Sequence, residues 1–328
     1  MAEWLGLGRS DIERFLRVAD GLGWDWDRSA LPEVATDLGC RMTTGPDDSY
    51  SAAEYHAGDF TASVLFHVDK EQGRVLQITI HVTDIVGRGE GQAFLLDTFA
   101  GTVAAGRAVF GDPDRSKSGA LATVRWDRPG GVAKLYRLPR SVQLDWTRPD
   151  YAKWEDEMDA QALEDHPMDA DEMETARNEG RPRWRPAESD SEWETLRNTL
   201  VDAMVWLQAG DAVGLEGPGP WSAFVNQAPT ELIVEANCND FLRGEDRLTE
   251  EMSLALARIG FQPSDPPMHP LLWRDFEWPL SSAGYRTAAD MIIEGFRIVY
   301  PEITVADLSW NFLTGGRLSE MAPIVDAR

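Results

Sequence analysis

Apolar and polar positions follow one another along the chain in patterns that predict helices and strands in both halves. Residues 231–236 (ELIVEA) place Leu, Val and Ala on one side and two Glu residues on the other, as in a half-buried strand. Thr249 and the two Glu residues after it predict the start of a helix, and Gly260 predicts its end. The block from Glu231 to Phe261 therefore has the form strand, polar segment, helix, and it holds none of the residues that a catalyst would need.

Similar patterns extend through the rest of the C-terminal half. Ser191-x-x-Glu194 has the form of a capping box, which predicts a helix with apolar positions from Trp193 to Leu207. The Gly-Pro-Gly-Pro run at 217–220 predicts a hairpin turn. The further elements that we expect in this half are strands 212–216, 221–227 and 271–278 and a helix over 285–300.

The N-terminal half begins with another capping box, Ser10-x-x-Glu13, ahead of apolar positions at helical spacing. Runs with a period of two, separated by turns that contain Gly, then predict a series of strands. The expected helices are 10–22, 30–38 and 91–110, and the expected strands are 50–57, 60–68, 74–86, 121–126, 132–136 and 142–146.

This order of elements is typical of the α+β class, in which helices cover one face of an antiparallel sheet. We therefore predict two tandem domains, 1–150 and 188–328, each an antiparallel β-sheet flanked by α-helices. We interpret 151–187 as an acidic and Pro-rich linker between them. Residues 150–179 carry twelve acidic side chains against two basic ones, and we expect an acidic helix around 155–176.

The chain of 328 residues has a formal net charge of −25. This charge argues against a nucleic acid or a membrane as a partner, because the anionic phosphates would be repelled. It would attract a protein with a basic surface, or it would serve solubility alone. No apolar run approaches the length of a membrane span, and no signal sequence is recognisable. The two cysteines, Cys40 and Cys238, lie in separate halves, as expected for a protein of the reducing cytoplasm.

The sequence carries no recognisable motif for catalysis, a cofactor or a metal ion. The turn Gly87-Arg88-Gly89-Glu90-Gly91 departs from the dinucleotide fingerprint at its third Gly, and its Glu would stand where a phosphate belongs. His67 and His81 lie on adjacent predicted strands, but two imidazoles without a third ligand make a poor metal site. We therefore expect no cofactor and no enzyme activity, with a pocket around His67 and His81 as the enzymatic alternative.

Aromatic side chains offer another kind of site, because Trp, Tyr and Arg are the usual anchors of protein–protein contacts. Most of the thirteen Trp side chains must belong to the cores. Several lie near turns or close to one another in the sequence, and we predict that some of them bind a partner. The candidates are Trp24, Trp26, Trp221, Trp273, Arg274, Phe276 and Trp278.

Short segments of the C-terminal half carry a family resemblance. They are Trp193-x-x-Leu196, the run from Leu232 to Leu242 (LIVEANCNDFL), Arg247-Leu248-Thr249, Ile259-Gly260-Phe261, Trp273 and Tyr300-Pro301. Through them, residues 193–301 resemble the TY-Chap domain, a group likened to type III secretion chaperones and YbjN-like proteins. The Pro-rich stretch 262–271 is longer than the spacer of that family. The N-terminal half looks like an uncharacterised actinomycete domain family with an opening helix and a Trp-x-Trp motif, here Trp24-Asp25-Trp26.

The resemblance implies a sheet platform that binds another polypeptide, and it carries no catalytic residue over to this chain. In such chaperones an extended partner segment lies over the sheet or helix surface, or two copies of the chain pair. We therefore expect a non-enzymatic protein-binding module that shields another polypeptide, as a chaperone of a secreted protein or as a toxin-neutralising partner. The alternatives are the enzyme described above and a structural or regulatory protein whose domains serve dimerisation.

Overall fold

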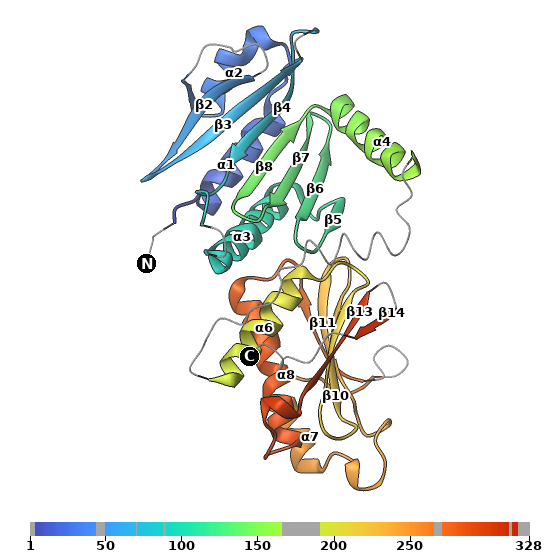
Figure 1. The fold of residues 1–328 in the computed structure, drawn as a ribbon. Helices are drawn as coiled ribbons and strands as arrows, with labels where there is room; N and C mark the ends of the chain where they lie inside the picture. The colour runs from blue at the N-terminus through green and yellow to red at the C-terminus, as the bar shows by residue number, and fades with distance from the viewer. Residues whose placement is uncertain are drawn as a thin grey trace. The chain divides into compact units, whose positions relative to one another are not determined.

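A computed structural model describes residues 4–43, 50–69, 71–87, 90–165, 191–265, 271–314 and 317–320. The chain divides into two compact units (Figure 1), which are Met1–Ser116 with Leu121–Pro182 and Lys117–Ala120 with Arg183–Arg328. We call them the first unit and the second unit and describe each by itself.

The first unit is built on an antiparallel sheet of eight strands, in the order β1-β2-β3-β4-β8-β7-β6-β5. Hairpins connect β2 to β3, β3 to β4, β6 to β7 and β7 to β8, so most neighbours in the sheet are also neighbours in the sequence. The strands are β1 (Cys40–Met42), β2 (Tyr50–Ala57), β3 (Phe60–Asp69), β4 (Arg74–His81), β5 (Arg115–Lys117), β6 (Ala122–Arg128), β7 (Gly131–Arg137) and β8 (Val142–Thr147).

The helix α3 (Gln92–Phe110) packs on the central strands of this sheet and on α1 (Arg9–Gly21). Gly106 permits the close approach, because a Cβ atom there would lie 2.5 Å from the ring of the buried Trp126. By length and composition α3 could cross a membrane, but it buries Leu95, Phe99 and further side chains within the first unit. The remaining helical elements of this region are η1 (Arg28–Ala30) and α2 (Leu31–Asp37).

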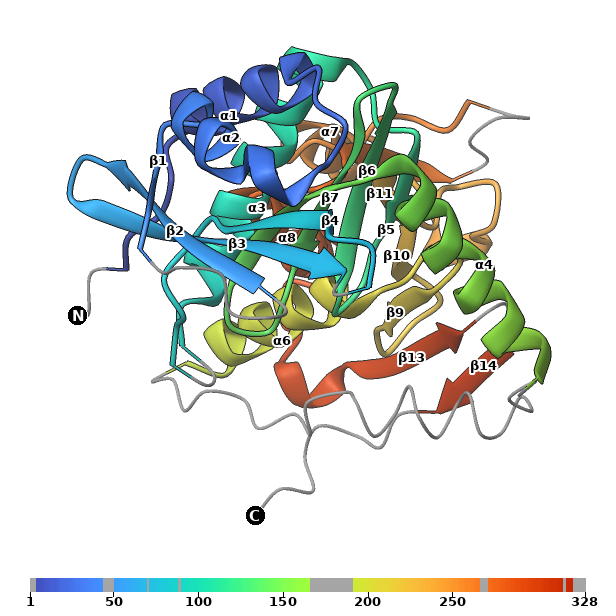
Figure 2. The ribbon, with the colours of Figure 1, turned by 90° about the horizontal axis from the view of Figure 1, so that it is seen from above.

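The acidic helix α4 (Pro149–Asp165) packs on the opposite face of β7 (Figure 2). Asp156 lies 2.7 Å from Arg125 and Glu155 lies 2.6 Å from Lys134, so part of the acidic run is paired with cations of the sheet. The expected acidic helix therefore begins earlier than residue 155 and occupies the start of the segment that we interpreted as a linker. The rest of that segment, from residue 166 onward, lies outside the residues that the structure describes.

The second unit has an antiparallel sheet with the strand order β12-β11-β10-β9-β13-β14. Its helices lie against one face of this sheet (Figure 1). The strands are β9 (Ala212–Glu216), β10 (Ser222–Gln227), β11 (Glu231–Ala236), β12 (Leu272–Glu277), β13 (Ser309–Thr314) and β14 (Arg317–Glu320). The helical elements are α6 (Glu192–Trp206), η2 (Gly244–Asp246), α7 (Glu250–Arg258), α8 (Ser282–Val299) and η3 (Val305–Asp307).

The core of the second unit lies between its helices and its sheet. Trp221 is 1% exposed and meets Phe296 of α8 edge to face, with ring centroids 4.7 Å apart. Gly295 makes room for this indole, since a Cβ atom there would lie 2.8 Å from the ring. Large side chains from widely separated segments thus close the core, and each helix is held mainly by the apolar face that it buries.

The prediction of an α+β chain with two antiparallel sheets flanked by helices is confirmed. Thr249 caps α7 as predicted, since its hydroxyl accepts a hydrogen bond from the backbone N–H of Met252. The capping box at Ser10 is wrong: α1 begins at Arg9, and Glu13 forms ion pairs with Arg9 and Arg17 instead. The predicted strand 74–86 ends earlier, at His81, and the four strands that we did not predict are β1, β5, β13 and β14.

Candidate partner-binding surface

The second sheet has one face covered by helices and one face on which no described helix of its unit packs (Figure 1). Side chains alternate between the two faces along every strand. In β11, Leu232 and Val234 are fully buried on the helix side, whereas Ile233 and Glu235 point to the other side and are partly exposed. We call this second side the open face.

The register of the sheet brings further aromatic and apolar side chains to the open face. Glu235 is paired with Phe224 of β10 and with Trp273 of β12, so both rings lie on the same side as Glu235. Phe224 lies over Gly214 of β9, where a Cβ atom would come within 2.8 Å of its ring. Phe224, Ile233 and Trp273, from three adjacent strands, are all partly exposed.

Carboxylates lie between and beside these three side chains. Glu231 and Ile233 of β11 are paired with Glu277 and Asp275 of β12, and the three acidic residues are exposed. Glu235 accepts a hydrogen bond from the side chain of Asn226, which holds its carboxylate above the sheet. Strands β9 to β12 contain one basic residue, Arg274, and its pairing with Val234 places it on the helix side. On the open face of these strands, Glu235 therefore lies between Phe224 and Trp273, and Asp275 lies beside Ile233, so apolar and negatively charged side chains are interspersed.

The predicted cluster in β12 is divided between the two faces. Trp273 lies on the open face, whereas Arg274 and Phe276 lie on the helix side. The Arg274 guanidinium stands over the Phe276 ring, 5.3 Å from its centroid. Backbone hydrogen bonds of 2.7 and 3.1 Å link Trp273 to Gln262 at the outer edge of β12. The outward backbone groups of the edge strand β12 are therefore paired with Gln262 at Trp273.

Three of the predicted partner-binding tryptophans are buried side chains. Trp26 is 5% exposed, Trp221 is 1% exposed and Trp278 is 3% exposed. A partner that meets the folded units as described would not reach these rings.

Period-two alternation assigns Ile233 and Glu235 to the exposed side of their strand, and that signal was available in the sequence. The position of Phe224 depends on the pairing of β10 with β11, which the sequence does not reveal.

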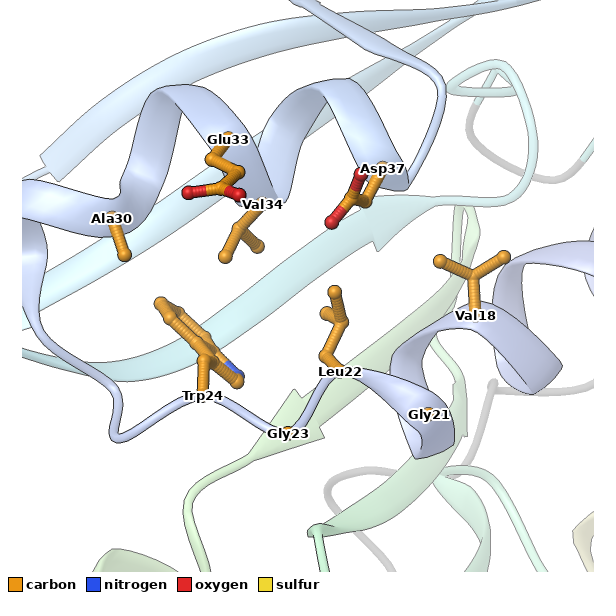
Figure 3. Close-up of a pocket in the computed structure, with 9 residues that line it drawn as sticks. All are labelled: Val18, Gly21, Leu22, Gly23, Trp24, Ala30, Glu33, Val34 and Asp37. Carbon is orange, nitrogen blue, oxygen red and sulfur yellow. The ribbon is translucent and has the colours of Figure 1, made fainter.

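Trp24 belongs to a different feature, a cavity of the first unit with a volume of about 600 Å³ (Figure 3). The cavity lies between the C-terminal end of α1, the loop that follows it and α2. Trp24 lines it from the loop, and its ring stacks on Trp26 with centroids 4.9 Å apart. The Trp24 ring therefore lines the cavity, whereas the Trp26 ring lies in the core and packs against Trp24.

The histidine pair of the enzymatic alternative is not brought together. His67 pairs with Gln77, and His81 stands four residues further along β4, which corresponds to about 13 Å along a strand. Burial lowers the pKa of each imidazole. The predicted side-by-side arrangement of His67 and His81 is therefore wrong.

Asp145 of β8 lies on the same face of the first sheet as His67 and Gln77. It is paired with Thr79 of β4 and with Lys134 of β7. It is 4% exposed, and this burial raises the pKa of its carboxyl group to about 6. Gln143 donates a hydrogen bond to it at 2.9 Å, which limits the rise.

Within the described ranges, no group of three or more His, Cys, Asp or Glu side chains is arranged to hold a metal ion. Of the glycine-rich turn at 87–91, Arg88 and Gly89 lie outside the described residues.

Two family models match the chain. Residues 186–312 match TY-Chap3, described as the T3SS (YopN, CesT) and YbjN peptide-binding chaperone 3. Residues 10–148 match DUF6301, a family of unknown function. No curated protein and no solved structure matches the chain. The predicted resemblance to TY-Chap is confirmed, and the match to a family of peptide-binding chaperones supports a protein-binding role for the second unit.

Proposed function

We propose that the protein is a non-enzymatic, chaperone-like module whose second unit holds an extended segment of another polypeptide on its open face. The observation that carries the proposal is the set of Phe224, Ile233 and Trp273 on that face, with carboxylates between and beside them. Partly exposed aromatic side chains at the centre of a polar rim are the usual anchors of a protein interface. The match of this unit to peptide-binding chaperones supports the same role.

The chemistry of the open face defines the kind of segment that would bind. The three apolar side chains require apolar side chains on the bound segment. Glu231, Glu235 and Asp275, which lie between and beside them, favour Lys or Arg side chains at neighbouring contact positions, because opposite charges steer association and suppress wrong partners. The preferred segment therefore carries both apolar and basic side chains on the side that faces the sheet, where the contacting side chains of a strand are two residues apart.

The biological setting of this binding is part of the proposal. A chaperone of a secreted protein and a neutraliser of a toxin would both cover an apolar, basic segment of their partner. Cys40 and Cys238 are buried and form no disulfide in the described part of the chain, as suits a protein of the reducing cytoplasm. The net charge of −25 favours a basic protein surface as the partner over nucleic acid or an anionic membrane.

The proposal is tested by selecting ligands for the full chain from a library of random twelve-residue peptides. We expect enrichment of peptides that carry apolar and basic residues at positions two apart, and fluorescence anisotropy then gives their dissociation constants. Trp273→Ala should weaken binding at least about 30-fold, since a hot-spot side chain contributes about 2 kcal/mol or more. Trp154→Ala is the matched control, because Trp154 is 51% exposed on α4 of the first unit. Equal affinity of the two variants would refute the proposed face.

Charge is tested separately with paired substitutions. The double variant Glu231→Gln/Asp275→Asn should bind a selected peptide about fivefold more weakly and show a smaller salt dependence, as expected for exposed charges. The control Asp59→Asn/Glu302→Gln removes two exposed carboxylates from other sites and should bind as the unmodified protein does. A control that weakens binding as much as the test pair would show that net charge alone attracts the peptide.

A final variant distinguishes binding on the face from addition of a strand at the edge. In β12 the backbone groups of Trp273 point away from β11, and the alternation of the ladder directs those of Asp275 the same way. Asp275→Pro therefore removes an outward N–H group and keeps the ladder to β11. We expect Asp275→Pro to bind like Asp275→Asn. Loss of binding in the Pro variant alone would contradict the open face as the site and favour the edge.

A further inference from the structure

The cavity of the first unit combines an aromatic wall with two carboxylates (Figure 3). Trp24 and Leu22 stand on the loop side, and Glu33, Val34 and Asp37 stand on the α2 side. Val34 is buried, whereas Leu22 and Trp24 are partly exposed and the two carboxylates are exposed. The floor is thus apolar and the acidic groups stand at the opening.

The loop that carries Trp24 is held in place by its neighbours. The carbonyl oxygen of Trp26 accepts a hydrogen bond of 2.7 Å from the N–H of Val75, and the N–H of Arg28 donates to Gly73 at 3.1 Å. Trp26 has a φ of 62°, a left-handed conformation that is uncommon for a bulky side chain and costs on the order of 1–3 kcal/mol. This conformation sends the Trp26 ring into the core and leaves the Trp24 ring stacked above it at the cavity.

The two carboxylates are left without a neutralising partner. Glu33 and Asp37 are one helical turn apart on α2, where like charges repel each other. Among the residues that the structure describes, neither of them forms an ion pair or a hydrogen bond through its carboxylate. Burial of a cation between them would relieve their repulsion. The Nε1–H group of Trp24 is also shielded from solvent and has no hydrogen-bond partner in the described part of the chain.

We propose that this cavity binds a basic side chain, preferentially arginine, that a second polypeptide presents. The aliphatic part of the side chain lies on Leu22 and Val34, the guanidinium stacks on the indole of Trp24, and its N–H groups donate to Glu33 and Asp37. An aromatic face attracts a cation, and a planar guanidinium both stacks on a ring and forms paired hydrogen bonds with carboxylates. The site belongs to the first unit and stands independently of the open face of the second.

A peptide suits the cavity better than a free amine does. The glycines that line its rim, Gly21 and Gly23, are exposed and leave the opening accessible to a neighbouring main chain. A long basic side chain can therefore enter while its backbone stays outside, with its alkyl stem against the apolar floor and its charged end at the carboxylates. A free guanidinium ion would gain the charge interaction without the contacts of the stem and the main chain.

The test uses the full chain and two peptides, acetyl-Gly-Arg-Gly-amide and its citrulline analogue, which keeps the shape of the side chain and lacks the charge. Two-dimensional NMR follows the indole N–H signal of Trp24, which is assigned by its absence in Trp24→Phe. We expect the arginine peptide to shift this signal and the citrulline peptide to bind at least about tenfold more weakly. Equal binding of both peptides, or no shift with millimolar arginine peptide at low salt, would overturn the proposal.

Variants and a second ligand complete the test. Glu33→Gln/Asp37→Asn should reduce the affinity for the arginine peptide at least about tenfold, whereas the control Asp59→Asn/Glu302→Gln should leave it unchanged. Guanidinium chloride at the same concentration should shift the Trp24 signal less than the peptide does. Unchanged affinity in the first variant would remove the carboxylates from the site. An equal effect of guanidinium would contradict recognition of a polypeptide and leave a site for small cations.

Discussion

Replacement of Asp145 by Asn should stabilise the protein at neutral pH and have little effect in acid. Asp145 is 4% exposed, and Lys134, its neighbour across the sheet, is held 2.6 Å from Glu155 of α4. The burial of Asp145 therefore outweighs the attraction of Lys134, and it raises the pKa of Asp145 from 3.8 to about 6. A raised pKa means that the folded protein favours the neutral carboxyl group. The stabilisation from this group is full below pH 3.8 and is lost as the pH rises through about 6.

The size of the effect follows from the difference between the two pKa values. A rise from 3.8 to about 6 corresponds to a free energy on the order of 3 kcal/mol between pH 4 and pH 8. Asn is neutral at every pH and keeps an oxygen that can accept the hydrogen bond from Gln143. The free energy of unfolding of Asp145→Asn minus that of the unmodified protein should therefore increase by about this amount across the range.

Urea unfolding measured at several pH values between 4 and 8 provides the assay. The two proteins are compared at each pH, so the contributions of the other carboxylates to the free energy of unfolding cancel in the difference. Asp59→Asn, at an exposed turn, is the control and should give a difference that does not depend on pH. A difference that stays constant or shrinks as the pH rises would refute the reasoning, because it would show that charged neighbours outweigh burial at Asp145.

Three further substitutions test how the helices are held. Gly295→Ala should destabilise the second unit by about 1 kcal/mol, because overpacking against Trp221 outweighs the gain in helix propensity. A Cβ atom at Gly101 of α3 would have nothing within 4 Å, so Gly101→Ala should be stabilising. Thermal unfolding gives the sign of each change in stability, and two equal signs would contradict the packing argument. Asp156→Asn removes the ion pair of α4 with Arg125, so amide hydrogen exchange in α4 should be about fivefold faster, as expected for a loss of about 1 kcal/mol. Unchanged exchange would show that this ion pair does not hold the helix.

Local sequence patterns were sufficient for most elements of the fold. The apolar alternation of 231–236 and the cap at Thr249 depend on a few adjacent residues, and both are found where the sequence places them. Strand β13 was missed because its place beside β9 comes from a pairing across about a hundred residues, for which no local pattern exists. Its Trp310 and Phe312 complete the helix-covered side of the sheet, so a part of the core was missed with it.

The candidate surface depended on information that the sequence carries only in part. Period two places Trp273 and Arg274 on opposite sides of their strand, but the positions of the helices decide which side is covered. Trp221 looks like a candidate anchor because it follows a Gly-Pro turn, and only the position of α8 shows that Phe296 and Gly295 enclose it. The cavity at Trp24 is formed by three segments around the turn from α1 to α2, and no spacing rule predicts its two carboxylates.

The burial of both cysteines offers a practical route to the partner. Cys40 is 8% exposed and Cys238 is 5% exposed, and burial raises the pKa of the Cys40 thiol to about 12. Thiol reagents react with the thiolate, so the native side chains should stay unmodified in the folded protein. A single cysteine introduced at a partly exposed position would therefore be the one reactive thiol of the chain. Photo-crosslinkers attached at Ile233 or at Ala30, one position at a time, would then record which surface a bound polypeptide touches.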